Sequence, residues 1–589
     1  MDQLKHLFIL AFLAASNSFA IAQNNISLNE SKSLDKSMRE SIFLHSNATT
    51  FITGETLLYK LYCLNPVNNS TSSISKIAYV ELIDQNKQTI SKSKIYLENG
   101  TGQGDYFIPT TLKTGNYKLV AYTKWNLNNA LTNIFKTDIA IINPFQPYQE
   151  EGGNKKNSTV VSLKNNEYEK QTSKSANSVF TEKVAFEIDK KSYQTREKVT
   201  LKIKSLIEKG NYSIAIRKID ELPTKLQLTA EEFVKDNSSI PNPATTKDSL
   251  FFIPELRAEL ISGSITSKKE NADLNDKSVA LSLPGESFAF KIAKTNRSGK
   301  FTFLLDKNPN QTNCVIQVLE DNRDDYTIHL DELPKFDTSS LLFPSELILT
   351  AHNTTAIEER SVANQIENAY YHLKKDSLAP NAKTTPFFHT IEKAYILDDY
   401  TRFPTLKETI IEVLIEIYFK KNNDLYSLHL RDNSKDLEIY GLPLVLVDGL
   451  AIKDVNELFD INMSTIYKVS LINQGYVYGP NLFSGLISFE TKNNNFISKS
   501  SGDYIKKIDI QRPTIKKVYF SPDYASGTLS QRIPDYRHQL LWMPELNIAE
   551  KENTVSFYTS DVTGNFEIVL EGFTKKGVPI SLKKSFEVK

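Results

Sequence analysis

Three short segments share one pattern, which constrains the fold more than any other feature of the chain. Each begins with Gly-Asn and continues with an aromatic residue and apolar side chains at alternate positions, and the segments are Gly115–Tyr122, Gly210–Ile216 and Gly564–Leu570. Gly-Asn is typical of turns, and an alternation of period two is typical of a half-buried strand. We therefore predict that each segment is a late strand of a β-sandwich.

Length and charge limit the classes of function. At roughly 100 to 200 residues per domain, a chain of 589 residues corresponds to about three to five domains. Hydrophobic residues make up 40% of the sequence, which is ample for several packed cores. The 70 Lys and Arg residues balance the 70 Asp and Glu residues, so no net field attracts nucleic acid or an anionic membrane. We expect no nucleic-acid partner.

Residues 1–22 have the pattern of a signal peptide. Lys5 and His6 precede an apolar run from Leu7 to Ala15, and Ala20-Ile21-Ala22 fits a small-x-small cleavage site. Residue 23 is Gln rather than Cys, so we expect an exported product without a lipid anchor on that residue. No later segment approaches the ~18 apolar residues of a membrane-spanning helix.

Strand-like segments with turn residues between them fill residues 45–143. Their spacing, with no helical period between them, predicts an immunoglobulin-like sandwich. The runs TGETLLYKLY, AYVELID and GQGDYFIPTTLKTGNYKLVAYTKW resemble the MG2 domain of the α2-macroglobulin family. The thioester motif Cys-Gly-Glu-Gln of that family does not occur in the chain, so the resemblance does not imply covalent trapping.

Three further segments follow this sandwich. Residues 151–178 are polar and read as a linker, and residues 183–255 resemble a second macroglobulin-like β unit that is short enough to pair with strands of a neighbour. Residues 256–332 place an Asn-Arg-Ser-Gly turn before the aromatic strand Lys300–Leu304. This order of strands resembles the carboxypeptidase regulatory-like domain, a β-sandwich without peptidase chemistry.

The pattern becomes helical within residues 344–430, a predicted connector that leads into the next segment. One helix is predicted to present an apolar face made of Val362, Ile366, Ala369 and Tyr370. A second is predicted over Leu406–Ile417, with Thr405 as N-cap and Glu408 completing a capping box.

Residues 394–492 combine short strands with turns and are predicted to form a small α+β domain. We predict strands at Leu444–Val447, Ile466–Ile472 and Leu486–Thr491, a helix that begins at Asp454–Phe459, and a loop over Gly475–Gly485. The segment resembles the plug of TonB-dependent transporters in three motifs, which are Val447-Asp448-Gly449, Asp460-Ile461 with Ile466 and Val469, and Tyr478-Gly479 with Gly485, Ile487 and Thr491.

The sequence after this segment is too short for a transporter barrel. Only 98 residues follow Thr491, whereas about 22 strands of roughly 10 residues need on the order of 220. The order of modules resembles large exported Bacteroidetes proteins that carry such a plug without a barrel. Residues 505–589 complete the pattern as a predicted C-terminal sandwich, and we expect four aromatic residues to anchor it to the plug-like segment, namely Tyr519, Tyr524, Tyr536 and Trp542.

The sequence contains no recognisable catalytic motif. The eight histidines form no short ligand pair, and Ser484 lacks a nucleophile elbow. Cys63 and Cys314 are predicted to be buried, unpaired thiols. We interpret Asp398-Asp399 as the cap of a turn, Asp448 as part of a turn with Gly449, and residues 306–313 as a solvated turn rather than a calcium loop. No catalytic residue, metal or cofactor is therefore predicted.

The Gly475–Gly485 loop is the best candidate for an interaction surface, through Tyr476, Tyr478, Asn481, Leu482 and Phe483. The alternative is that these aromatic residues pack under the C-terminal sandwich. We expect a non-enzymatic exported scaffold or accessory subunit that binds an outer-membrane barrel protein or complex. A macroglobulin-like protease-interacting protein without thioester, and a surface ligand-binding protein, are the alternatives.

Overall fold

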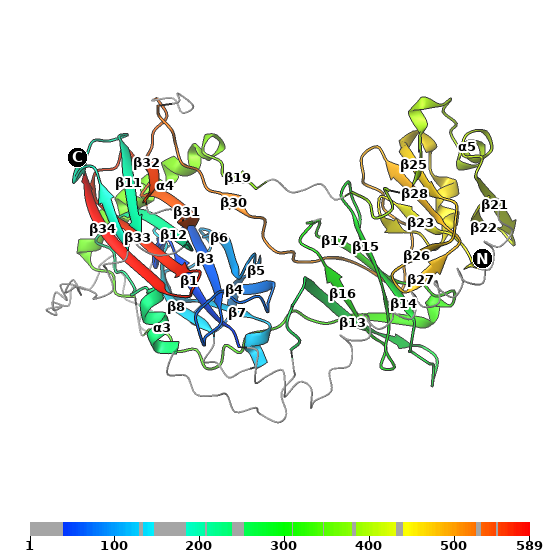
Figure 1. Cartoon of the computed structure of the whole chain (residues 1–589), viewed down its shortest axis with the longest axis horizontal. Helices are drawn as coiled ribbons and strands as arrows, with labels where there is room; N and C mark the ends of the chain where they lie inside the picture. The colour runs from blue at the N-terminus through cyan, green and yellow to red at the C-terminus, as the bar shows by residue number, and fades with distance from the viewer. Residues whose placement is uncertain are drawn as a thin grey trace. The chain divides into compact units, whose positions relative to one another are not determined.

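A computed structural model describes residues 39–128, 134–146, 184–205, 209–237, 252–308, 310–344, 347–379, 385–390, 392–431, 440–525, 532–548 and 552–589. The predicted signal peptide (1–22) and linker (151–178) lie outside these residues. The fold is mainly β, as the sequence predicted, and its strands form several sandwiches (Figure 1). Within the described residues, no helix is both long and apolar enough to cross a bilayer.

The chain divides into two compact units, each built from separate stretches of sequence. The two-sandwich unit contains residues 38–257, 334–380 and 513–589, and the mixed unit contains residues 258–333 and 381–512. The chain therefore passes from one unit to the other several times.

The first sandwich of the two-sandwich unit has two sheets. Residues such as Phe43, Leu61, Leu119 and Ile139 fill the space between them and are almost completely buried. One sheet has the strand order β1 (Ser41–Ser46), β3 (Thr56–Leu64) and β6 (Thr101–Phe107). The other has the order β2 (Thr50–Ile52), β8 (Phe135–Ile142), β7 (Gly115–Thr123), β4 (Ile77–Ile83) and β5 (Thr89–Tyr96).

The second sandwich joins two segments that the sequence analysis placed in separate domains, 183–255 and 505–589. One sheet has the order β10 (Ser192–Tyr193), β34 (Pro579–Val588), β33 (Gly564–Thr574), β12 (Gly210–Lys218) and β31 (Gln539–Ile548). The other has the order β32 (Glu552–Tyr558), β11 (Lys198–Ser205) and β9 (Val184–Ile188). Each segment alone has too few strands to cover its apolar faces, and the two together bury Tyr212, Ile214 and Phe566. A short helix, α3 (Ala230–Asn237), packs near β34 and β33.

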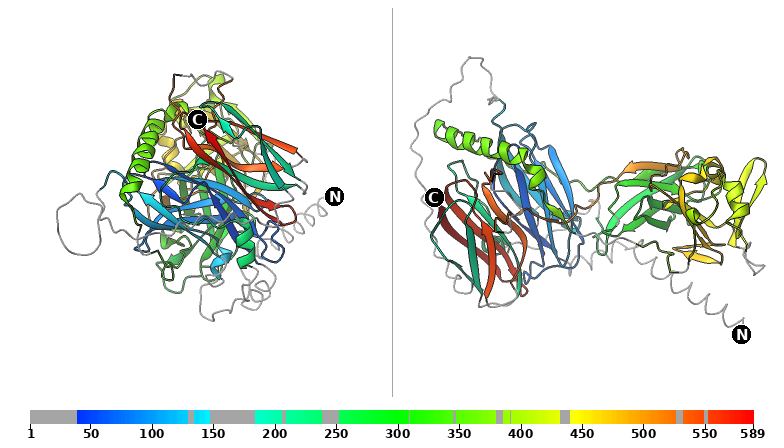
Figure 2. Two further views of the ribbon diagram at one scale, coloured as in Figure 1. Left: turned by 90° about the vertical axis from the view of Figure 1, so that its left-hand side faces the viewer. Right: turned by 90° about the horizontal axis from the view of Figure 1, so that it is seen from above.

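Helix α4 (Thr354–Ala369) belongs to the same unit and lies alongside the first sandwich (Figure 2). The predicted face was wrong, because Val362 is 54% exposed and Tyr370 is 36% exposed. The helix instead buries Arg360 and Ala363, since Arg360 forms ion pairs with Glu55 and Asp220. The predicted 344–430 connector is thus divided between the units at residue 380. The short strands β19 (Ser377–Leu378) and β30 (Lys517–Val518) pair nearby.

The mixed unit begins with a third sandwich. One sheet has the order β16 (Lys300–Leu305), β13 (Glu259–Ser267) and β18 (Tyr326–Leu330). The other has the order β15 (Ala289–Lys294), β14 (Ser278–Leu283), β17 (Asn313–Val318) and β29 (Ile505–Asp509). Strand β29 was predicted to open the C-terminal sandwich. It pairs with β17 instead, because its Ile505 completes the core of this third sandwich.

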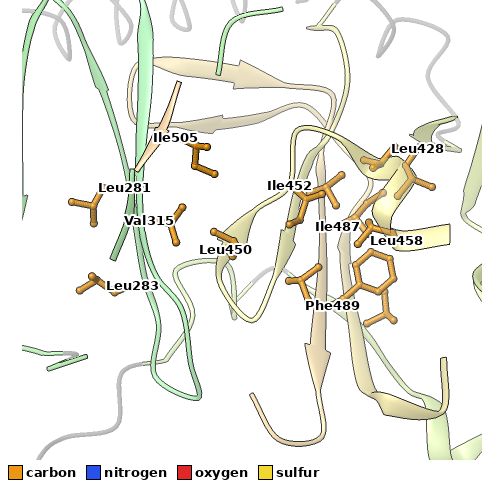
Figure 3. Packing of buried hydrophobic residues seen from close by; sticks show 14 of the residues in the cluster. Leu281, Leu283, Val315, Leu428, Leu450, Ile452, Leu458, Ile487, Phe489 and Ile505 are labelled. Atoms are coloured by element: carbon orange, nitrogen blue, oxygen red, sulfur yellow. The ribbon is translucent and has the colours of Figure 1, made fainter. Parts of the chain in front are cut away.

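A five-stranded sheet, called the mixed sheet, forms the rest of this unit. Its order is β20 (Lys393–Ile396), β25 (Ile466–Ile472), β28 (Leu486–Thr491), β23 (Leu444–Val447) and β24 (Leu450–Ala451), with β23 and β28 parallel. Three of these strands have the predicted bounds. Val315 and Ile505 of the third sandwich share one core with Leu450, Ile487 and Phe489 (Figure 3), so the sandwich and the sheet pack as one body.

Short elements complete the mixed sheet. Helix α5 (Leu406–Glu412) begins at the predicted capping box, in which Thr405 accepts from the Glu408 N–H. It ends five residues earlier than predicted, and Ile417 begins the hairpin of β21 (Ile417–Asn422) and β22 (Leu425–Leu430). The predicted helix near Asp454 is a 3-10 helix, η8 (Val455–Asp460), and two further turns are η6 (Leu397–Asp399) and η9 (Met463–Thr465).

Candidate recognition surface

The predicted interaction loop is a small hairpin, made of β26 (Tyr476–Tyr478) and β27 (Asn481–Phe483). The Tyr478 ring lies 4.1 Å from the Phe387 ring and 5.4 Å from the Phe290 ring, measured between centroids. The Tyr478 hydroxyl donates a hydrogen bond to the Phe290 carbonyl of β15, and burial raises the Tyr478 pKa. Tyr478 therefore anchors the hairpin to the third sandwich.

The other predicted loop residues divide between the core and the surface. Asn481 hydrogen-bonds the Ser278 hydroxyl at 3.1 Å. Tyr476 and Phe483 border the buried cluster that contains Phe290. Leu482 points outward and is 43% exposed, as is its cross-strand partner Val477 at 52%. The inward aromatic residues pack on strands β14 and β15 of the third sandwich, which belongs to the same unit as the hairpin. They do not pack under the C-terminal sandwich.

The β20 edge of the mixed sheet carries a second group of exposed apolar side chains. Strand β20 pairs with β25 and has no second neighbour among the described strands. Tyr467 is an extra residue in β25, since the register shifts between Ile466 and Lys468. Such a bulge re-aims a side chain, and Tyr467 is 39% exposed. Ile396 of β20 (37%) and Tyr400 after it (45%) are also exposed, and we call these three residues near the strand edge the edge patch.

Ion pairs hold this edge in place. Lys393 at the start of β20 lies 2.8 Å from Glu416, which also accepts a 2.6 Å hydrogen bond from Tyr395. Asp398 accepts from the Arg402 guanidinium at 2.9 Å, and this bond lowers the Asp398 pKa. Asp398 thus stabilises the turn after β20, as its position in the sequence predicted.

Asp448 has the same kind of structural role inside the sheet. Its φ of +48° and the +83° of Gly449 form the predicted turn between β23 and β24. Its buried carboxylate accepts hydrogen bonds from the Thr491 N–H at 2.7 Å, the Thr491 hydroxyl at 2.6 Å and the Phe496 N–H at 3.0 Å. With three donors, the carboxylate ties the turn to the end of β28.

The two thiols and Ser484 are buried. Cys63 and Cys314 are buried and unpaired, as predicted, and burial raises the pKa of Cys314 to about 12. Ser484 is buried beside the hairpin, and Asp306 forms an ion pair with Lys291 at 3.1 Å. Within the described part of the chain, no group of three His, Cys, Asp or Glu side chains is placed to hold a metal ion.

One close His–Ser pair escaped the sequence analysis. His45 Nδ1 and Ser213 Oγ share a hydrogen bond of 2.7 Å, although 168 residues separate them. Both side chains have 0% exposure, and burial lowers the His45 pKa to about 3. The pair joins the two sandwiches of its unit and is closed to a substrate. Only the pairing of distant strands could have revealed it.

The four aromatic residues expected to contact the plug-like segment have other partners. The Tyr519 hydroxyl donates to Asp105 at 3.2 Å, and Trp542 packs on Leu58, so both contact the first sandwich. Tyr524 donates to Asp535 at 2.6 Å, and the Tyr536 N–H donates to Glu367. That prediction was wrong because residues 513–589 fold within the two-sandwich unit.

No protein-family model and no curated protein matches this sequence. Solved structures that are similar include Salmonella α2-macroglobulin reacted with methylamine, with 8% identity, a TM-score of 0.23, and coverage of 94% of this chain and 39% of that one. Escherichia coli α2-macroglobulin activated by porcine elastase is 10% identical, with a TM-score of 0.23 and coverage of 93% of this chain and 44% of that one. The native conformation of the Escherichia coli protein is 9% identical, with a TM-score of 0.24 and coverage of 94% of this chain and 40% of that one. The chain thus spans about two fifths of the length of these macroglobulins.

Proposed function

We propose that this chain is a non-enzymatic, exported scaffold or accessory subunit at the outer membrane that binds an outer-membrane barrel protein or complex. The edge patch carries the proposal. A strand with a free edge offers backbone N–H and C=O groups to an added strand, and the neighbouring apolar side chains give such a contact specificity. Ile396, Tyr400 and Tyr467 supply these side chains beside β20.

The opposite side of the mixed sheet supports a fixed orientation for this edge. Tyr478 and Asn481 attach the hairpin to the third sandwich, and the shared core around Leu450 attaches β24 to the same sandwich. A rigid support lowers the entropic cost of presenting a binding edge. The sealed thiols and the enclosed His45–Ser213 pair favour a binding role over catalysis.

Affinity isolation from detergent-solubilised cell envelopes tests the proposal. The tagged full chain is compared with a double variant of the edge patch, Ile396→Lys with Tyr467→Ser. The control is Val362→Ser with Tyr371→Ser, which changes two similarly exposed apolar residues of the other unit, at 54% and 55%. We expect the wild-type chain and the control to recover the same barrel protein and the edge variant to lose it. Recovery of no barrel protein by the wild-type chain would refute the proposal.

A further inference from the structure

A cavity of about 220 Å³ lies inside the two-sandwich unit. Its walls come from the turn between β2 and β3, the end of β12, helix α4 and the segment before β31; they include Gly54, Arg217, Asn364 and His538. This volume has room for several water molecules or for a small organic group. The cavity is thus an open one, lined by four segments that are far apart in sequence.

Most charged groups around the cavity are paired. Arg360 lies 2.6 Å from Glu55 and 2.7 Å from Asp220. Arg537 lies 2.7 Å from Asp535, and Glu367 accepts from the Lys374 ammonium at 2.7 Å. Their charges and hydrogen bonds are satisfied within the protein, so these groups need no ligand.

Arg217 differs from its neighbours. Its guanidinium makes one long hydrogen bond, 3.5 Å to the Thr50 carbonyl, and lies 5.9 Å from the Phe51 ring centroid. Among the described residues it has no carboxylate within ion-pair distance. Burial and the nearby Arg360 lower its pKa to about 10. A guanidinium has five N–H donors, so most of those on Arg217, which lines the cavity, have no acceptor among the described residues.

His538 adds a second unused group. Its Nδ1 is buried and has no hydrogen-bond partner. His538 lines the same cavity as Arg217, and it precedes Gln539, the cross-strand partner of Arg217. Charged groups near it are Arg360 of α4, Lys218 and Arg217 of β12, Glu55 of the β2–β3 turn, and Asp220 after β12. Burial, followed by Arg360, lowers the His538 pKa to about 4, so the ring is neutral near pH 7.

We propose that Arg217, on the cavity wall that it shares with His538, binds the carboxylate of a small organic acid or of an acidic peptide side chain. The planar guanidinium matches a carboxylate in two parallel hydrogen bonds, and His538 forms part of the cavity wall near it. Glu55 and Glu367 also line the cavity and oppose a dianion such as phosphate. Phe51, Leu58 and Ala363 provide apolar walls for the carbon chain of the acid. The site is independent of the edge patch.

Calorimetric titration of the full chain tests this site, with propionate, an N-acetylated peptide containing one Asp, and inorganic phosphate as probes. We expect saturable binding of a carboxylate probe, weakened by roughly tenfold or more in Arg217→Gln and by less in Arg217→Lys, which keeps the charge without the planar fork. Arg297→Gln changes an exposed arginine of the mixed unit and should bind like wild type. Propionate binding identifies a small acid as sufficient, and binding of the peptide alone identifies an acidic side chain.

A second measurement follows His538 by NMR and does not depend on the stability of a variant. A bound carboxylate adds a negative charge beside the ring, so it should raise the His538 pKa above its low value in the free protein. The proposal is overturned if no carboxylate probe gives saturable binding, if Arg217→Gln binds like wild type, or if phosphate binds as tightly as the carboxylates. A His538 pKa that stays the same in the saturated protein also overturns it.

Discussion

At the scale of a single residue, Arg360 explains why α4 buries its polar face. Its side chain is 1% exposed, and it contacts two carboxylates and the Thr50 carbonyl. Loss of one member of a buried ion pair leaves the other charges unpaired, which costs about 3–5 kcal/mol. We expect Arg360→Met to lower the free energy of unfolding of the two-sandwich unit by this amount.

Tryptophan fluorescence during urea unfolding measures this effect, because both tryptophans of the chain, Trp125 and Trp542, lie in the two-sandwich unit. The matched control is the triple variant Arg360→Met, Glu55→Gln, Asp220→Asn, which removes the carboxylate charges as well. It should recover most of the lost stability. A loss below about 1 kcal/mol in Arg360→Met would contradict a stabilising role for the network.

Glu571 predicts a pH dependence of stability in the same unit. The side chain is 3% exposed, and burial raises its pKa from 4.5 to about 8, against hydrogen bonds from the Ser581 hydroxyl and the Ala230 N–H. The folded state therefore binds more protons than the unfolded state between these values, so stability falls as pH rises from about 4.5 to about 8. In Glu571→Gln this fall should be smaller by on the order of a few kcal/mol.

Unfolding curves at pH 5 and pH 8 check the sign. The control is Glu567→Gln on the same strand, whose side chain is 38% exposed and faces Lys583 at 3.6 Å. It should leave the pH dependence unchanged. If Glu571→Gln loses as much stability between the two pH values as wild type, another group causes the dependence.

The sequence predicted residues whose partners lie close along the chain. The Thr405–Glu408 capping box spans three positions, and Asp448 stands next to the glycine that shares its turn. Arg360 was not predicted as a buried ion-pair residue, because Glu55 is 305 positions away in the chain. The same distance problem concealed His45–Ser213.

At the scale of elements, Asp448 ties a turn to a strand in the mixed sheet. Asp448→Ala removes an acceptor of three hydrogen bonds and places alanine at a φ of +48°, so we expect a loss of about 2–4 kcal/mol. The mixed unit contains no tryptophan, so hydrogen exchange of the amides in β23 and β28 is the appropriate measurement. Their exchange should become much faster.

Asp424 provides the matched control for this prediction. It has a similar φ of +64° in the turn between β21 and β22, but its side chain is 91% exposed. Asp424→Ala should therefore cost only the backbone preference, about 1 kcal/mol. Equal effects of the two variants would show that the buried hydrogen bonds contribute little.

Elements were predictable where one face of a regular strand is apolar. Strands β23, β25 and β28 have the predicted bounds because their apolar residues are continuous or alternate. The apolar face of α4 was assigned to the core by periodicity alone, although ion pairs determine which side is buried. The predicted interaction loop shows a related limit, since its three aromatic residues, Tyr476, Tyr478 and Phe483, pack against the third sandwich of the same unit.

At the scale of the whole molecule, the second sandwich depends on two segments, residues 184–218 and 539–588, that are more than 300 positions apart. Strand β12 has β31 and β33 as its two neighbours, and β11 pairs with β32, so three of these contacts come from residues after 538. The sequence could show that each segment contains strands. It could not show which strands pair, because alternation carries no information about a distant partner.

A chain that ends at His538 should therefore lose the second sandwich and keep the mixed unit. Amides of β11 and β12 should exchange at nearly unprotected rates, because the shorter chain lacks β32, the partner of β11, and β31 and β33, the partners of β12. Amides of β25 and β28 should stay protected, because their neighbours all lie within residues 381–512.

A chain that ends at Phe586 removes only the last residues of β34 and serves as the control. Protection of β12 in the shorter chain would mean that residues 183–255 fold without the C-terminal strands, whereas loss of protection in β25 as well would mean that the two units fold together.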